Sequence, residues 1–207
     1  MRLLVVTAVA AEQAAIAVAA PGVDVRVVGV GPAAAAAGTS RALAGGEHDC
    51  VLFAGIGGGF APLAPGDIAI ASTIAFADLG AETPGTADGF TAITELGFGN
   101  DRYEVAPKLS VELTDVTGGH LGTVVTVATV TGTAATADAL VARFPDAVAE
   151  GMEGAGVAAA AEAFGVPFGE LRAISNAVGP RDRAAWRIPD ALASLGRAIA
   201  AIAARAD

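Results

Sequence analysis

The sequence contains one cysteine and two histidines, so an intrachain disulfide is excluded and a zinc site has almost no ligands to draw on. The cysteine, Cys50, opens the apolar run CVLFAG, where a lone thiol packs as a small hydrophobic side chain. His48 and His120 fall in expected loops, and no other histidine or cysteine accompanies them. We therefore expect neither a metal ion nor a redox cofactor.

Basic residues are also scarce. The chain has 12 lysines and arginines against 22 acidic residues, which gives a formal net charge of −10. Such a chain repels a phosphate backbone, so we expect no nucleic-acid partner. The acidic excess favours solubility rather than a particular function.

No apolar run reaches the roughly 18 residues that a membrane-spanning helix needs, although 54% of the residues are hydrophobic. Much of that share is alanine. The start, MRLLVVTAVAAEQAAIAVAAPG, has the outline of a signal peptide, but Glu12 and Gln13 interrupt it, and RLLVVTAV is typical of a first strand. We expect a cytoplasmic protein with no membrane association.

Short β-rich apolar runs alternate with alanine-rich stretches, a pattern typical of an α/β fold. We expect a single three-layer domain over residues 1–207, with a mostly parallel central sheet flanked by helices. The expected strands are 2–9, 23–30, 50–56, 66–73, 122–130 and 168–175. The expected helices are 10–20, 32–44, 134–144, 152–164 and 190–205. Residues 76–105 break the alternation and form a candidate binding loop.

Ligands of open α/β sheets bind at the carboxyl ends of the strands, and polar or glycine-rich segments fall at several of these ends. GIGGGF (55–60) follows the third expected strand. It fails the dinucleotide fingerprint because the sixth position is Phe60, and the chain has no phosphate-binding P-loop motif. Two readings stay open: a tight turn, or a close backbone approach to a ligand, with Gly57 contacting it.

Two glutamates differ in how readily they are explained. Glu12 follows the first strand, and taken alone it suits a solvated acid in the first turn of a helix. Glu153 opens a helix with almost no polar face, so its carboxylate needs partners or a ligand. Glu150 and Glu162 are expected to be solvated.

Three further residues have ordinary structural explanations. Met152 is of a type that usually packs in the core. Arg172 could neutralise a buried acid, and Asn176 could cap the last strand.

The segment MEGAGVAAAAEAFGVPFGELRAISN (152–176) resembles the signature of the purine nucleoside phosphorylase and nucleosidase family. In that family Met-Glu starts a helix and R-A-I-S-[DN] ends a strand. VVTAVAAE (5–12) resembles the family's first strand and its catalytic glutamate, and VGVGPAAAAAGT (28–39) its second glycine turn. AGIGGGFAPLAPGDIAIAS (54–72) resembles its glycine-rich loop and the strand after it. The resemblance covers nearly the whole chain.

The resemblance implies cleavage of the N-ribosidic bond of a purine nucleoside. The transition state has oxocarbenium character on the sugar and negative charge on the departing base, as in glycoside hydrolysis. Glu12 would orient water as a general base, Glu153 would accept from the ribose hydroxyls, and Met152 would pack on the ribose. Family members form dimers or larger assemblies, so we expect a homo-oligomer, a dimer or a tetramer, whose small-molecule partner is a nucleoside.

Asn176 is a departure from the adenine-cleaving members, which have aspartate there. A 6-oxopurine presents two acceptors along its N7/C6 edge, and an amide can donate to that edge. We therefore expect hypoxanthine to be preferred over adenine; the alternative is that Asn176 has no role in recognising the base. A second departure is Val130, which falls where relatives stack a phenylalanine on the base.

Three segments narrow the resemblance to a subgroup whose nucleoside carries a carboxyphenyl group: DLGAETP (78–84), ELGFGN (95–100) and RAISNAVGPRDRAAWRIPDAL (172–192). The aromatic residues that could stack on its base are Phe76, Phe90, Phe98 and Trp186. The arginines that could bind its carboxylate are Arg102, Arg181, Arg183 and Arg187.

A phosphorylase needs cationic donors for phosphate, and the glycine turns GVGP and GIGGGF contain no arginine, lysine or serine. Arg172 is the nearest cation. Water is therefore the expected acceptor. A phosphorylase or an adenosyl-thioether nucleosidase of the same fold stays open, and so does a nucleoside sensor without catalysis.

Overall fold

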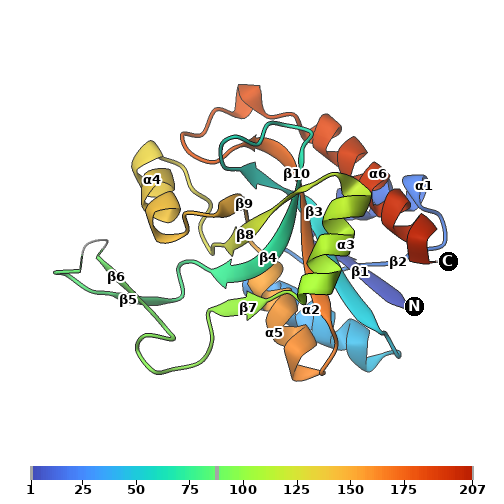
Figure 1. Ribbon diagram of the computed structural model, residues 1–207, viewed down its shortest axis with the longest axis horizontal. Coiled ribbons are helices and arrows are strands. Elements are labelled where there is room, and N and C mark those ends of the chain that lie inside the picture. The colour runs from blue at the N-terminus through green and yellow to red at the C-terminus, as the bar shows by residue number, and fades with distance from the viewer. Residues whose placement is uncertain (1, 87–88, 207) are drawn as a thin grey trace.

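The computed structural model describes residues 2–86 and 89–206 (Figure 1). Its strands are β1 (Leu3–Thr7), β2 (Asp24–Val27), β3 (Cys50–Gly59), β4 (Ile68–Phe76), β5 (Gly80–Glu82), β6 (Phe90–Ala92), β7 (Arg102–Glu104), β8 (His120–Thr126), β9 (Ala147–Gly151) and β10 (Phe168–Ala177). Its α-helices are α1 (Ala10–Ala19), α2 (Pro32–Ala44), α3 (Pro107–Thr117), α4 (Ala134–Arg143), α5 (Gly154–Ala163) and α6 (Ile188–Ala206), and a 3₁₀ turn covers Arg183–Ala185.

The central sheet has the strand order β10-β4-β8-β9-β3-β1-β2, with β7 paired to β4. A further pairing joins β10 to β3, so β3, β10, β4, β8 and β9 close into a ring, from which β1 and β2 extend. The α/β class is confirmed, but the expected mostly parallel sheet is in fact mixed. β10 meets β4, β9 meets β3, and β7 meets β4, all antiparallel. An apolar sequence predicts that a strand is buried, but it does not predict whether the strand runs parallel or antiparallel to its neighbours.

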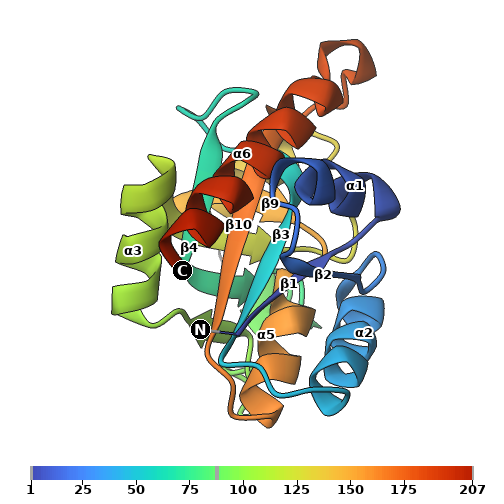
Figure 2. The ribbon, with the colours of Figure 1, turned by 90° about the vertical axis from the view of Figure 1, so that its right-hand side faces the viewer.

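Helices cover both faces of the sheet, as expected for three layers. Successive residues of a strand point to opposite faces. Val5 and Leu52 pack with α1 and α6, whereas Leu4 and Phe53 pack with α2 and α5. Figure 2 shows α1 beside α6 and α2 beside α5. The two apolar faces of β1 and β3 therefore explain their near-continuous hydrophobic sequence.

The expected helices and strands all occur close to their expected bounds. However, α3, β9 and the short strands β5, β6 and β7 of the insert were missed, and one segment was misassigned. α3 was missed because its sequence, PKLSVELTDVT, is only weakly apolar. β9 was missed because it is only five residues long and lies directly before Met152 and Glu153, without a separate apolar run. The three glycines at 57–59, expected as a tight turn or as a close backbone approach to a ligand, complete β3, where their missing side chains let β9 and β10 approach closely.

The insert at 76–105 contains the hairpin of β5 and β6, which projects from the sheet in Figure 1. Two of its residues, Ala87 and Asp88, lie outside the described part of the chain. The buried carboxylate of Asp101 accepts hydrogen bonds from the backbone and the hydroxyl of Thr94. That contact ties the segment after β6 to the base of β7.

Cys50 is buried at the start of β3, as expected. Burial, assisted by the nearby charge of Asp49, raises the pKa of its thiol to about 11, so it stays protonated and packs as an apolar group. Within the described ranges, no helix combines the length and the apolar character needed to cross a membrane.

The packing of α2 against α5 yields a stability prediction. A methyl group at Gly156 of α5 would lie 2.1 Å from the backbone oxygen of Pro32. Helix propensity alone predicts that Gly156→Ala stabilises the protein by about 0.5–1 kcal/mol. We predict the opposite, a loss of about 1–3 kcal/mol, because the two helix backbones must separate.

Urea unfolding measures this loss as a lower midpoint. Ala37→Gly, on the exposed side of α2, is the control and shows the ordinary cost of a helical glycine. A raised midpoint for Gly156→Ala would show that the helix contact is not tight.

Candidate active site

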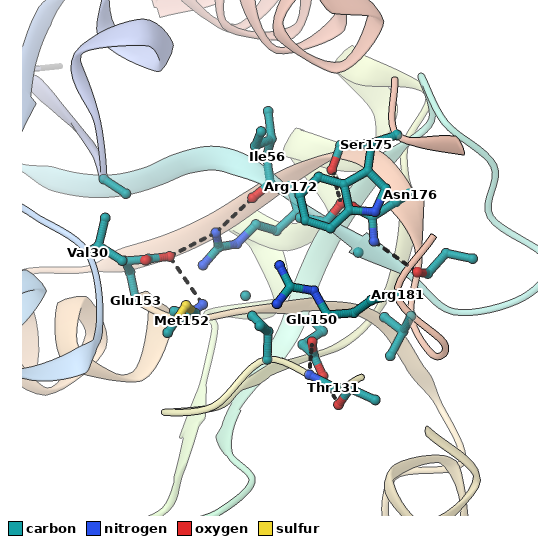
Figure 3. Close-up of a pocket in the computed structure, with 18 of the residues that line it drawn as sticks. Val30, Ile56, Thr131, Glu150, Met152, Glu153, Arg172, Ser175, Asn176 and Arg181 are labelled. Carbon is teal, nitrogen blue, oxygen red and sulfur yellow. Dashed lines mark hydrogen bonds and ion pairs between the residues drawn. The ribbon is translucent and has the colours of Figure 1, made fainter. Parts of the chain in front are cut away.

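A cavity of about 280 Å³ opens where β3, β9 and β10 meet the loops after β1 and β2 (Figure 3). Its wall also includes residues 130–131, residues 175–181 and Trp186. The residues singled out from the sequence that line it are Glu12, Gly57, Val130, Met152, Glu153, Arg172 and Asn176. Segments far apart in the chain therefore supply one concave site.

Glu12 is buried in the first turn of α1, not solvated, and its carboxylate is held by three backbone N–H groups. Oε2 accepts from Ala8 (2.9 Å) and Val9 (3.1 Å), and Oε1 accepts from Ile56 of β3 (2.9 Å). Burial raises the pKa of Glu12, while the bond from Ile56 and the charge of Arg172 oppose that rise. The carboxylate is thus fixed at the wall of the cavity.

Glu153, the residue before α5, forms a buried ion pair with Arg172. Its Oε2 lies 3.0 Å from Arg172 Nη1, and Oε2 also accepts from its neighbour's backbone, Met152 N–H, at 3.2 Å. Oε1 accepts from Gly31 N–H, in the turn before α2, at 3.2 Å. The expected need of this carboxylate for partners is met by a cation and two amides.

Arg172 is only 2% exposed, and a second carboxylate neutralises it further. Its Nε donates to Glu170 Oε1 at 2.8 Å, and its Nη1 donates to the Ile56 carbonyl at 3.1 Å. The guanidinium lies 4.2 Å from the centre of the Phe53 ring. Burial lowers the pKa of Arg172, but the charges of Glu170 and Glu153 outweigh it, and the net pKa is raised. The arginine therefore stays charged inside the fold.

Two glycines make room for this network. A methyl group at Gly151 would lie 2.2 Å from Arg172 Cζ, and one at Gly154 would lie 2.0 Å from Glu170 Oε2. The glycines that flank Met-Glu in the sequence are thus required by the buried arginine and its partner.

Asn176 lies near the end of β10, with its amide oriented by its neighbour. The Ser175 hydroxyl lies 2.7 Å from Asn176 Oδ1 and 3.1 Å from the Gly57 carbonyl oxygen. Asn176 Nδ2 donates to the Ala177 carbonyl at 2.9 Å. One N–H of the amide is used by Ala177, and the second N–H can donate to a ligand.

Glu150 was expected to be solvated, and that expectation is wrong. It is 6% exposed and lines the cavity from β9. Its Oε1 accepts from Thr131 N–H at 3.0 Å, and its Oε2 accepts from the Thr131 hydroxyl. Burial raises its pKa and these two bonds oppose the rise. The burial of Glu150 was not predicted, because β9 itself was missed.

Of the aromatic and arginine candidates, Trp186 and Arg181 line the cavity. Arg181 lies over the Trp186 ring, 5.6 Å from its centre. The other candidates are absent from the cavity wall as described: Phe76, Phe90, Phe98, Arg102, Arg183 and Arg187.

Phe98, an expected substrate contact, does not line this cavity. It is 67% exposed in the segment between β6 and β7, which projects away from the ring of strands. The same holds for the expected binding loop as a whole, since no described residue of 76–105 lines this cavity.

The arrangement offers two fixed carboxylates, Glu12 and Glu153, in one cavity with an amide donor at the end of β10. A carboxylate held near water can act as a general base, and one facing hydroxyls can accept their hydrogen bonds. Both functions are needed to replace a substituent on a sugar.

Solved structures with similar folds include nucleosidases. A 5′-methylthioadenosine/S-adenosylhomocysteine nucleosidase from S. pneumoniae, in complex with a transition-state inhibitor, has a TM-score of 0.84 at 20% identity and covers all of both chains. A futalosine hydrolase of Helicobacter pylori has a TM-score of 0.80 at 18% identity, covering 97% of this chain and 94% of that one.

Curated relatives are closer in sequence. A futalosine hydrolase of Streptomyces coelicolor is 50% identical over 98% of this chain and 95% of its own length. Another, from Acidothermus cellulolyticus, is 44% identical over 97% of this chain and 90% of its own length. The model of the phosphorylase superfamily matches residues 6–206. The chain belongs to the phosphorylase superfamily and, within it, to the family of these futalosine hydrolases.

Proposed function

We propose that the chain is a futalosine hydrolase. It hydrolyses the N-ribosidic bond of futalosine and releases hypoxanthine and dehypoxanthine futalosine, a step of menaquinone biosynthesis. The observation that carries the proposal is the meeting of Glu12 and Glu153 at one cavity, in a chain 50% identical to a futalosine hydrolase. The single domain, the homo-oligomer and the cytoplasmic location stay predictions.

In this proposal Glu12 activates the attacking water. Its carboxylate takes a proton as the water oxygen bonds to the anomeric carbon and the bond to the purine nitrogen breaks. Hypoxanthine leaves with the bonding electron pair. Three backbone donors keep Glu12 in place, so no reorganisation is needed when the charge develops.

Glu153 binds the sugar in the same proposal. It accepts hydrogen bonds from the ribose hydroxyls, and its negative charge favours the positive charge that develops on the ring. Met152 packs on the ribose. The donating amide of Asn176 faces the N7/C6 edge of hypoxanthine and stabilises the departing base.

The charge balance of the site favours water over phosphate. Arg172 is already paired with Glu153 and Glu170, so its charge is compensated. A phosphate dianion beside Glu12 and Glu153 would meet two further negative charges. Hydrolysis is therefore the better supported reaction, and phosphorolysis is the alternative.

The direct test is an end-product assay. Futalosine, inosine and methylthioadenosine are incubated with the protein, with and without phosphate. We expect free hypoxanthine from futalosine in the absence of phosphate. Release of adenine instead, or a strict need for phosphate, would assign the chain to one of the alternatives.

Glu12→Gln tests the base. We predict that kcat falls about 10²–10⁴-fold while binding of futalosine is largely kept, because the amide cannot take a proton. The wild-type rate should fall as the pH drops through the raised pKa of Glu12, since only the ionised form accepts the proton. This acid limb should lie above the ordinary range of a glutamate and vanish in the variant.

Stopped assays across pH measure the effect, with the exposed Glu162→Gln as the control. A nucleoside sensor without catalysis would bind futalosine equally well in both forms and release no hypoxanthine from either.

Arg181 is the arginine that we assign to the carboxylate of futalosine, since it alone of the four candidates lines the cavity. Arg181→Gln should lower kcat/KM for futalosine about 10- to 100-fold, the worth of a charge-assisted hydrogen bond. Inosine, which lacks the carboxyphenyl group, should be affected little.

Arg183→Gln is the matched control, because Arg183 also lies near Trp186 but does not line the cavity. Equal losses for futalosine and inosine would remove the assignment of Arg181.

A further inference from the structure

Glu150 is a buried carboxylate at the cavity wall that the proposed chemistry does not use. Burying a carboxylate costs free energy unless a cation or hydrogen-bond donors compensate its charge. Thr131 occupies one lone pair on each oxygen of Glu150, through its amide and its hydroxyl. Each oxygen keeps further accepting capacity, and no cation is paired with this group among the described residues.

The strand register places Glu150 opposite Asn176. Gly58 of β3 pairs with Glu150 of β9 on one side and with Asn176 of β10 on the other. Neighbouring strands lie about 4.8 Å apart, so the two backbones stand about 10 Å apart across the glycine. Figure 3 shows Glu150 beside Thr131 and Asn176 at another side of the same space.

The sugar-binding groups lie further back along the same strand. Glu12 and Arg172 both bond to Ile56, and Arg172 holds Glu153. Ile56 precedes Gly58 by two residues, roughly 7 Å along a strand. The cavity therefore has a sugar end at Ile56 and a base end at Gly58.

The two sides of the base end complement a 6-oxopurine. Such a base presents acceptors at N7 and O6 and a donor at N1–H, whereas adenine presents an amino donor at C6 and an acceptor at N1. The amide of Asn176 can donate to the first edge. An ionised carboxylate can only accept, so it suits N1–H and repels the lone pair of adenine N1.

We propose that Glu150 accepts the hydrogen bond of hypoxanthine N1–H and, together with Asn176, makes the site specific for a 6-oxopurine. This role rests on the proposed function, since it assumes that a purine occupies the base end. Thr131 fixes the carboxylate through its two donors and joins it to the loop between β8 and α4.

Glu150→Gln tests the proposal. Its carbonyl can accept from the Thr131 amide, which leaves an N–H to donate into the cavity and favours adenine N1 over hypoxanthine N1–H. We expect the ratio of kcat/KM for futalosine to that for its 6-amino counterpart to fall about 10- to 100-fold, one charge-assisted hydrogen bond. Glu162→Gln is the control and keeps the wild-type ratio.

Calorimetry measures the affinity of the wild-type protein for free purine bases, so this test needs neither turnover nor a variant that folds. The wild-type protein should bind hypoxanthine at least tenfold more tightly than adenine or 1-methylhypoxanthine, which has no N1–H. Equal affinity for hypoxanthine and 1-methylhypoxanthine overturns the inference. So does a Glu150→Gln variant whose kcat/KM falls by the same factor for futalosine and for its 6-amino counterpart. If the bases bind as expected but futalosine is not cleaved, the proposed function fails and the role of Glu150 stands.

Discussion

The ion network around Arg172 is the constraint on which the site depends. Arg172 and Glu170 are almost completely buried in β10, and Glu153 joins them from the start of α5. Removing one partner of such a network leaves an unpaired buried charge, which costs about 3–5 kcal/mol. The network therefore fixes Glu153 in one position, and glycines at 151 and 154 keep the space that it fills.

The closed ring formed by β3, β10, β4, β8 and β9 brings the other residues of the site close to the Arg172 network. Three successive residues of β3 meet the site. Ile56 bonds to Glu12 and Arg172, Gly57 accepts from Ser175, and Gly58 lies between Glu150 and Asn176 in the strand register. A methyl group at Gly57 would lie 2.6 Å from the backbone oxygen of Glu150 in β9, and one at Gly58 would lie 2.8 Å from Val178, just after β10. A glycine-rich strand thus brings groups from both ends of the chain to one cavity.

The sequence predicted the α/β class, the main helices and strands, and the residues Glu12, Glu153, Met152, Arg172 and Asn176 at the cavity. These residues sit in local motifs whose polar groups stand out against apolar neighbours.

Long-range features could not be predicted in the same way. The antiparallel pairings of β4, β9 and β10 depend on strand direction, which no apolar run encodes. Glu150 seemed solvated because its burial depends on Thr131, 19 residues away. Phe98, an expected substrate contact, does not line the cavity, and its segment lies away from the sheet in Figure 1.

In the proposed reaction, the carboxylates of Glu12 and Glu153 act on opposite sides of a single sugar. The most direct test is a crystal structure of Glu12→Gln with uncleaved futalosine. It should show the ribose hydroxyls on the Glu153 carboxylate, a water between the residue at position 12 and the anomeric carbon, and the hypoxanthine next to Gly58. A nucleoside seated outside this cavity, or a ribose turned away from Glu153, would contradict the account.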